Sequence, residues 1–358
     1  MKKTLLIFGT RPEWIKLLPV IREYHKRQLR DQLLIVHTGQ HDSLLNAELP
    51  KFGIQVDHQL LTKREGSGLN QLLAQLLCRF EQYLRSLSQQ GIKVDNMLVQ
   101  GDTASAYSAA LTAFHHKIPL LHLEAGLRTH NLQHPYPEEF YRRSISQLAS
   151  LHFVPSTHAR DNLLAEGVEE SDIQLVGNTV IDNLFHYISS PPSANARTVL
   201  ITLHRRTFCE AERHQYLAYF ERLISANPQY RFRWLQHPSQ PLSELVPAHP
   251  NLQFLDPLPF LEMLRQYQDT CLILTDSGGV QEEAAYLGIP CIVARKMTER
   301  QESLEAGVSK LIDLRQRDIP QILANFESEK LLFRNPLYGG GDSATQVVDA
   351  CLNYQIYD

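Results

Sequence analysis

The chain has 358 residues, more than one ordinary hydrophobic core accommodates, so two domains are expected. Hydrophobic residues make up 43% of it and charged residues 21%, as in ordinary globular proteins, and a formal net charge of -4 excludes a global basic field for nucleic acid. No run approaches the ~18 apolar residues of a membrane span, so neither nucleic acid nor a membrane is an expected partner.

The amino terminus places Lys2 and Lys3 before a short apolar run, as a signal peptide does. The run is too short for that and no small-residue cleavage site follows, so we expect a buried first strand and a cytoplasmic protein. The cysteines show no C-x-x-C spacing and the histidines no H-E-x-x-H spacing. No metal is therefore expected, and Cys271 and Cys291 are interpreted as core thiols.

Short apolar runs alternate with amphipathic stretches along the whole chain. The expected strands are 4–8, 32–37, 96–99, 120–123, 152–154, 174–175, 199–202, 231–234, 252–254, 271–275 and 291–293. The expected helices are 14–27, 69–90, 104–116, 139–149, 157–166, 211–226, 259–266 and 280–287. Alternation of this kind with continuously apolar strands predicts parallel sheets covered by helices on both faces.

The periodic pattern weakens between residues 188 and 197, where a stretch rich in serine and proline reads as a linker. We therefore expect an α/β fold of two Rossmann-like, doubly wound domains that face a central cleft. The first spans 1–187 and is joined by a C-terminal helix at 343–358, and the second spans 188–342. Ligands of such sheets bind at the carboxyl ends of the strands, so the cleft is the expected site.

The segment Gly9–Lys16 follows the first expected strand directly. It is not G-x-G-x-x-G, so no dinucleotide cofactor is indicated, and no other cofactor is expected. Arg11 and Lys16 place two cations near a helix N-terminus, which already favours anions. The alternative is a capped helix with solvent-facing charges.

Three carboxylates come from consecutive βα loops of the first half: Asp102, Glu124 and Glu138. Grouped carboxylates push one another's pKa values apart, which allows one to act as a base and another as an acid. Each also has a structural alternative. Asp102 can cap the next helix, Glu138 can complement a helix dipole, and Glu124 can pair with Arg128.

In the second half a buried strand ends in Ser277-Gly278-Gly279, which opens a helix. Ser277 can cap that helix or face a ligand, and the two glycines let a phosphate approach the backbone amides. Glu283, further along the helix, can reach a ribose hydroxyl pair. A plain helix cap is the alternative.

Two further segments add charge to the second half. His204 follows the first strand of the second domain and is followed by two arginines. Arg300 lies in a charged loop and can close on a diphosphate, although that loop alone is ordinary.

Together these segments resemble the non-hydrolysing UDP-N-acetylglucosamine 2-epimerases of bacteria. The segments that carry the resemblance, in the family's order, are GTRPEWIK at 9–16, TGQH at 38–41, QGDT at 100–103, HLEAGLRT at 122–129, PYPEE at 135–139, GNTVIDNL at 177–184, HRR at 204–206, TDSGGVQEEA at 275–284 and TER at 298–300. The resemblance implies a GT-B-like arrangement, usually a homodimer, and interconversion of UDP-N-acetylglucosamine and UDP-N-acetylmannosamine without NAD or a metal.

The resemblance also implies a role for each matching residue. The reacting carbons are surrounded by Asp102, Glu124, Glu138 and His204. The UDP-sugar is bound by Arg11, Lys16, Arg128, Ser277, Gly278, Gly279, Glu283 and Arg300. Gln40 and His41 match part of an allosteric site. The implied chemistry is elimination of UDP to a glycal, followed by re-addition with the proton on the other face of C2, in the service of surface polysaccharide synthesis.

The sequence leaves several alternative functions open. A GT-B glycosyltransferase would share the nucleotide-binding half but needs an acceptor pocket in the first domain. Thr207 and Leu235 stand where the family usually has Glu and His, which leaves open an epimerase for a different UDP-acetamido sugar. A hydrolysing epimerase and a non-catalytic sugar-nucleotide sensor are two further alternatives.

Overall fold

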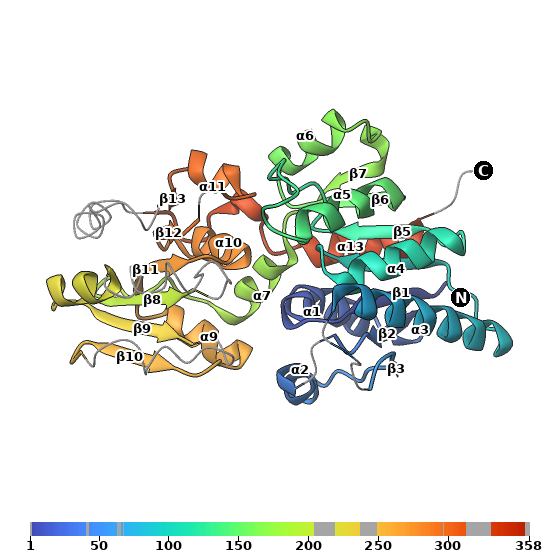
Figure 1. Ribbon diagram of the computed structural model, residues 1–358, viewed down its shortest axis with the longest axis horizontal. Coiled ribbons are helices and arrows are strands. Elements are labelled where there is room, and N and C mark those ends of the chain that lie inside the picture. The colour runs from blue at the N-terminus through green and yellow to red at the C-terminus, as the bar shows by residue number, and fades with distance from the viewer. Residues whose placement is uncertain are drawn as a thin grey trace. The chain divides into compact units, whose positions relative to one another are not determined.

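The computed structural model describes residues 2–40, 43–62, 66, 68–203, 219–236, 249–295, 297–312 and 331–354 (Figure 1). The chain forms two compact units, the first of Met1–Asn183 with Tyr338–Asp358 and the second of Leu184–Leu337. Each has a sheet of its own, and every pair of neighbouring strands that the structure describes is parallel. The α/β class with two parallel sheets is thus confirmed, whereas the domain limits at 187 and 342 stay a prediction.

The first unit contains a seven-stranded sheet in the order β3-β2-β1-β4-β5-β6-β7. Its strands are β1 Thr4–Phe8, β2 Leu33–His37, β3 His58–Gln59, β4 Asn96–Gln100, β5 Leu120–Leu123, β6 Leu151–Val154 and β7 Ile173–Leu175. The order runs outward in both directions from the β1–β4 pair, which makes that pair the topological switch point. The loops that leave the carboxyl ends of β1 and β4 diverge there, and this is where a doubly wound sheet has room for a ligand.

Alternate residues of β1 enter two different cores. Leu5 and Ile7 pack with the helices α3 Leu69–Gln89, α4 Ala104–His115 and α5 Glu138–Leu148. Leu6 and Phe8 pack with α1 Arg11–Lys26, α2 Ser43–Glu48 and α13 Ser343–Asn353 on the other face (Figure 1). Every residue of β1 is buried, so the amino terminus is a core strand as the sequence predicts.

The segment 177–183 joins the carboxyl-terminal helix to the first unit. It begins α7, Thr179–Tyr187. A Cβ atom at Gly177 would lie 2.7 Å from the carbonyl oxygen of Tyr338, so only glycine allows the two backbones to approach this closely. Asp182 accepts a hydrogen bond from the Ala344 amide at 2.8 Å, at the start of α13. The expected C-terminal helix thus belongs to the first unit and ends at Asn353.

The second unit repeats the arrangement with a six-stranded sheet in the order β10-β9-β8-β11-β12-β13. Its strands are β8 Thr198–Thr202, β9 Arg231–Leu235, β10 Leu252–Leu255, β11 Thr270–Thr275, β12 Cys291–Val293 and β13 Ser309–Leu311. Its helices include residues 219–226, α9 Phe260–Tyr267, α10 Gly278–Leu287 and α11 Gln301–Glu305. The switch point lies between β8 and β11.

The expected strands are all present, with ends that differ by one residue at most. The sequence analysis missed the short edge strands β3 and β13, and the helices α2, α7 and α11, which are too short to show a clear period. The remaining helix of the first unit is α6, Thr157–Ala165. The expected helix at 211–226 lies partly outside the described residues. None of the helices in the described ranges is long and apolar enough to cross a membrane.

Glu13 joins the two loops that diverge at the first switch point. Its Oε2 atom accepts hydrogen bonds from the amides of Gly9 at 3.0 Å and Thr10 at 2.7 Å, after β1. Its Oε1 atom accepts one from Thr103 Oγ1 at 2.6 Å, after β4. The side chain is buried, and removal from water raises the pKa of the Glu13 carboxyl to about 7 even though these hydrogen bonds lower it.

This raised pKa predicts a pH-dependent contribution to stability. Because the native state holds the proton more tightly than the unfolded state, the contribution is fully present below the ordinary pKa of a glutamate and is lost as the pH rises to about 7. The Glu13→Gln variant removes this titration. We expect the drop in unfolding free energy between about pH 5 and about pH 8, measured by urea titration, to shrink by roughly 2 kcal/mol. An unchanged drop would contradict this account of Glu13.

Candidate functional site

Lys16 and Glu124 form a buried ion pair at the carboxyl edge of the first sheet. The Lys16 Nζ atom lies 2.6 Å from both carboxylate oxygens of Glu124. Gln100, the last residue of β4, donates a hydrogen bond to Glu124 Oε2 from its side-chain amide. Both members of the ion pair are less than one-tenth exposed. The predicted phosphate-binding lysine therefore contacts a predicted catalytic carboxylate directly.

The backbone of Glu124 is strained. Its φ angle is 66°, in the left-handed region that residues with a side chain rarely adopt. Such a conformation costs about 1–2 kcal/mol, and residues of this kind concentrate at functional sites. Glu124 follows β5, so the turn directs its carboxylate toward Gln100 at the end of β4.

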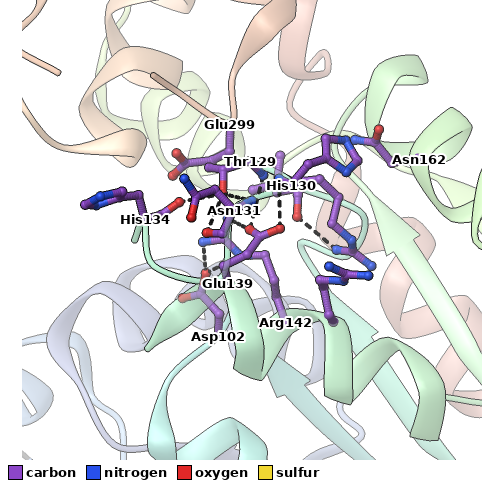
Figure 2. A network of polar contacts seen from close by, with 12 residues as sticks. Asp102, Thr129, His130, Asn131, His134, Glu139, Arg142, Asn162 and Glu299 are labelled. Carbon is purple, nitrogen blue, oxygen red and sulfur yellow. Dashed lines mark hydrogen bonds and ion pairs between the residues drawn. The ribbon is translucent and has the colours of Figure 1, made fainter. Parts of the chain in front are cut away.

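Asp102 lies beside α5 in a second polar network (Figure 2). Its Oδ2 atom accepts hydrogen bonds from Nε of Arg142 at 2.8 Å and from Nη2 of the same side chain. Arg142 also donates to the buried Glu139 at 3.2 Å, and Glu139 accepts from the amides of Thr129 and His130 at 3.1 Å each. The helix cap after β4 is Thr103, whose hydroxyl accepts from the Ala106 amide. The Asp102 carboxylate is thus held by an arginine and is not the cap.

Glu138, the first residue of α5, stands in a different environment. Its Oε2 atom is buried and accepts no hydrogen bond from any described residue. A buried carboxylate oxygen without a donor is unfavourable, which makes it a candidate for contact with a ligand. Asp102 lies in the loop after β4, whereas Glu124 and Glu138 lie at the start and the end of the single loop that joins β5 to α5. The expectation that the three carboxylates come from consecutive βα loops is therefore wrong, because only two loops supply them.

His122 supports the loop that carries Asp102. It is fully buried in β5, and its Nε2 atom lies 2.8 Å from the carbonyl oxygen of Gly101. Because a carbonyl can only accept, Nε2 carries the proton. Burial lowers the pKa of His122 to about 3, so the ring stays neutral at physiological pH and acts as a fixed donor.

Two predicted residues near α1 and α4 have partners within the first unit. Arg11 donates to Glu48 of α2 at 3.1 Å and 3.2 Å. Gln40 accepts hydrogen bonds from the amide and the hydroxyl of Ser105, at the start of α4. The predicted allosteric partner of Gln40, His41, lies outside the described residues.

Arg128 is a buried structural residue in this state of the chain. Its side chain is fully buried, and the guanidinium donates to Glu166 at 2.8 Å and 2.9 Å and to Ser146 at 2.9 Å. The alternative pairing of Arg128 with Glu124 is wrong, since Glu124 pairs with Lys16. These contacts connect α5 with the end of α6, and its predicted contact with substrate stays a prediction.

In the second unit the start of α10 has two distinct faces. A Cβ atom at Gly278 would lie 2.4 Å from Nη1 of Arg300, whose guanidinium also donates to Glu282 at 2.8 Å and 3.0 Å. At Gly279 no described atom lies within 4 Å of the Cβ position, apart from its two chain neighbours and the backbone of α10 itself. The Ser277 hydroxyl makes no helix-capping hydrogen bond. One face of the turn is thus filled by Arg300, and the other is open.

Glu283 lies one turn further along α10, on the side of Gly279. Its Oε2 atom accepts a hydrogen bond from the hydroxyl of Tyr267, the last residue of α9. The predicted His204 lies outside the described residues. Within the described ranges, no group of three His, Cys, Asp or Glu side chains is placed to hold a metal ion.

The sequence analysis missed the residues that hold the predicted ones in place. Gln100 and Arg142 position Glu124 and Asp102, and Tyr267 contacts Glu283. A polar residue at the end of an apolar strand was a signal for Gln100. Arg142 lies one turn after Glu138 on the same helix. This spacing places the two side chains on one face, but it could be used only once the start of the helix was known.

Comparison with known proteins identifies the family of this chain. A family model described as UDP-N-acetylglucosamine 2-epimerase matches residues 23–352. The UDP-N-acetylglucosamine 2-epimerase of Yersinia pestis is 33% identical, with 99% of each chain covered.

Two solved structures are similar over nearly the whole chain. The UDP-GlcNAc 2-epimerase of Neisseria meningitidis bound to UDP-GlcNAc is 31% identical with a TM-score of 0.89, covering 98% of this chain and 100% of that one. The enzyme of Methanocaldococcus jannaschii in complex with UDP-GlcNAc and UDP is 28% identical with a TM-score of 0.87, covering 99% and 100%. Sequence and fold agree in their assignment, and the chain belongs to the UDP-N-acetylglucosamine 2-epimerase family of isomerases.

Proposed function

We propose that this protein interconverts UDP-N-acetylglucosamine and UDP-N-acetylmannosamine without hydrolysing them. One observation carries the proposal. Three carboxylates gather at the switch-point edge of the first sheet, two of them held by cations and the third, Glu138, with a buried oxygen that accepts no hydrogen bond from the described residues. Such an arrangement supports proton transfer in a site that keeps its acids in different environments.

The chemistry requires an acid–base pair because the hydrogen on C2 of the sugar is only weakly acidic. In the proposed first step a carboxylate takes the C2 proton, a C1–C2 double bond forms, and the C1–O bond breaks to release UDP. In the second step UDP adds back to C1 and a proton reaches the opposite face of C2. Atoms and charges balance over the two steps, and no redox cofactor is needed. Asp102, Glu124 and Glu138 are the proposed proton carriers, and His204 is proposed to steady the diphosphate.

The departing diphosphate needs stabilisation as its charge grows. The N-terminal turn of α10 supplies backbone amides and the positive end of a helix dipole. The open space at Gly279 and the Ser277 hydroxyl support binding on that face, and Arg300 lies beside Gly278. Lys16 and Arg11 are the proposed cations on the side of the first unit.

We further propose that the protein is a cytoplasmic homodimer and that its product is used in surface polysaccharide synthesis. Exposed aromatic side chains at Phe114 and Phe140 support a protein contact on the helices α4 and α5. A single-chain mass in solution would contradict the dimer. An epimerase for another UDP-acetamido sugar is the alternative activity.

Incubation with UDP-N-acetylglucosamine alone in heavy water tests the proposed activity. We expect proton NMR to show UDP-N-acetylmannosamine together with loss of the C2 proton signal, because the proton is returned from a group that exchanges with solvent. A glycosyltransferase would leave the C2 proton in place without an acceptor. Release of free N-acetylmannosamine would instead indicate a hydrolysing enzyme.

Variants of the carboxylates test the assignment of proton transfer. Asp102→Asn and Glu124→Gln keep the shape of each side chain but remove its basicity. We expect each to lower kcat by about 100-fold or more, with C2 deuterium uptake falling in parallel, while UDP binding is retained. Near-normal epimerisation and exchange in both variants would show that these residues do not transfer the proton.

Two neighbouring glycines of α10 test where the diphosphate binds. Gly279→Ala fills open space, so we expect equal or slightly higher stability, by up to about 1 kcal/mol, with UDP affinity lower by roughly tenfold. Gly278→Ala forces Arg300 to move, so we expect it to lower stability by about 1–3 kcal/mol. Thermal unfolding and calorimetric titration measure both quantities. Wild-type UDP affinity in Gly279→Ala would place the diphosphate elsewhere.

A further inference from the structure

The first turns of α10 present two neighbouring faces with different surroundings. Gly278 and Glu282 are four residues apart and share one face, and Arg300 contacts both positions. Gly279 and Glu283 are also four residues apart and share the neighbouring face. On that face the space at Gly279 is open as far as the described part of the second unit extends. A ligand whose phosphate binds at Gly279 therefore has the Cα of Glu283 about 6 Å further along the helix axis, with a side chain that tilts back toward the helix N-terminus.

Tyr267 makes a hydrogen bond to the Glu283 carboxylate, on the same face as Gly279. It ends α9 and is fully buried, and its hydroxyl donates to Glu283 Oε2. Burial, together with the nearby charge of Glu283, raises the pKa of Tyr267 well above its ordinary value. The phenol therefore keeps its proton and acts as a donor at every physiological pH. A rigid aromatic side chain with only two side-chain torsions thus fixes a flexible glutamate.

We propose that Tyr267 is a positioning residue that orients Glu283 to accept hydrogen bonds from the ribose hydroxyls of the UDP-sugar. This inference rests on the proposed function and adds a specificity determinant to it. A glutamate that is free to rotate loses side-chain entropy when it binds a ligand. With one oxygen already engaged by Tyr267, the carboxylate plane is set before the nucleotide arrives. The ribose diol then donates to this oriented carboxylate, and a nucleotide that lacks the 2′-hydroxyl loses part of the contact.

The test compares the affinities of the full-length protein for UDP and for 2′-deoxy-UDP by calorimetric titration. Tyr267→Phe removes only the hydroxyl that contacts Glu283. Tyr219→Phe is the matched control, because it removes a buried phenol oxygen of the same unit that has no hydrogen-bond partner among the described residues. Glu283→Gln and the Tyr267→Phe/Glu283→Gln double variant complete a cycle that shows whether the tyrosine acts through the glutamate.

We expect the wild-type protein and the Tyr219→Phe control to prefer UDP over 2′-deoxy-UDP by roughly tenfold or more, as a charged hydrogen bond allows. Tyr267→Phe should reduce this preference to about threefold or less, and should raise the KM for the UDP-sugar more than it lowers kcat. In the Glu283→Gln background the same substitution should change the preference no further.

Four results would overturn the proposal. The first is a Tyr267→Phe variant that keeps the full wild-type preference, and the second is one that binds both nucleotides more weakly by the same factor, since an equal loss would mark a purely structural residue. An effect of Tyr267→Phe that persists in the Glu283→Gln background would show that the tyrosine does not act through the glutamate. If the wild-type protein binds UDP and 2′-deoxy-UDP equally well, Glu283 does not contact the 2′-hydroxyl and this inference is wrong. The proposed epimerase activity is tested separately, by C2 deuterium exchange.

Discussion

Pairing of charge at the carboxyl edges of the two sheets is the constraint on which the site depends. Parallel strands bring the loops of one sheet to a single edge, and in this chain those loops carry many charged side chains. A charge removed from water without a partner costs several kcal/mol. The structure avoids that cost by pairing Lys16 with Glu124, Arg142 with Asp102 and Arg300 with Glu282. Lys16, Glu124, Asp102 and Arg300 are thereby fixed in orientation before a substrate binds.

The exceptions to this pairing are as informative as the pairs. Glu138 has a buried oxygen that accepts no hydrogen bond from the described residues, and Glu124 adopts a left-handed backbone conformation. Both features cost stability, and neither is needed to form the sheet. Proteins retain such costs mainly where chemistry requires them. On these two features we base the proposal that the edge of β4 and β5 is the reactive part of the first unit, in contrast to Arg128, whose buried contacts connect helices.

The sequence predicted the parallel sheets because their strands are buried on both faces and read as continuous apolar runs. It also placed Asp102 and Glu124 at one edge, since each closely follows a strand of the same parallel sheet, but Glu138 comes from the same β5–α5 loop as Glu124 and not from a third loop. It did not predict that Glu124 pairs with Lys16 rather than Arg128, because those partners are 108 residues apart and no local pattern encodes the contact. The roles of Gly278 and Gly279 were likewise not separable in the sequence. Arg300, from the loop after β12, makes the difference between them.

The central claim is that the site is built to let a diphosphate leave C1 and return. It is tested most directly with UDP-N-acetylglucosamine that carries oxygen-18 in the bridge between C1 and the β-phosphorus. Breaking the C1–O bond frees that oxygen to rotate among the terminal positions of the phosphate. We expect phosphorus NMR of the recovered UDP-sugar to show the label spread between bridging and non-bridging positions at a rate comparable to epimerisation. Inversion at C2 with the label kept entirely in the bridge would contradict the account.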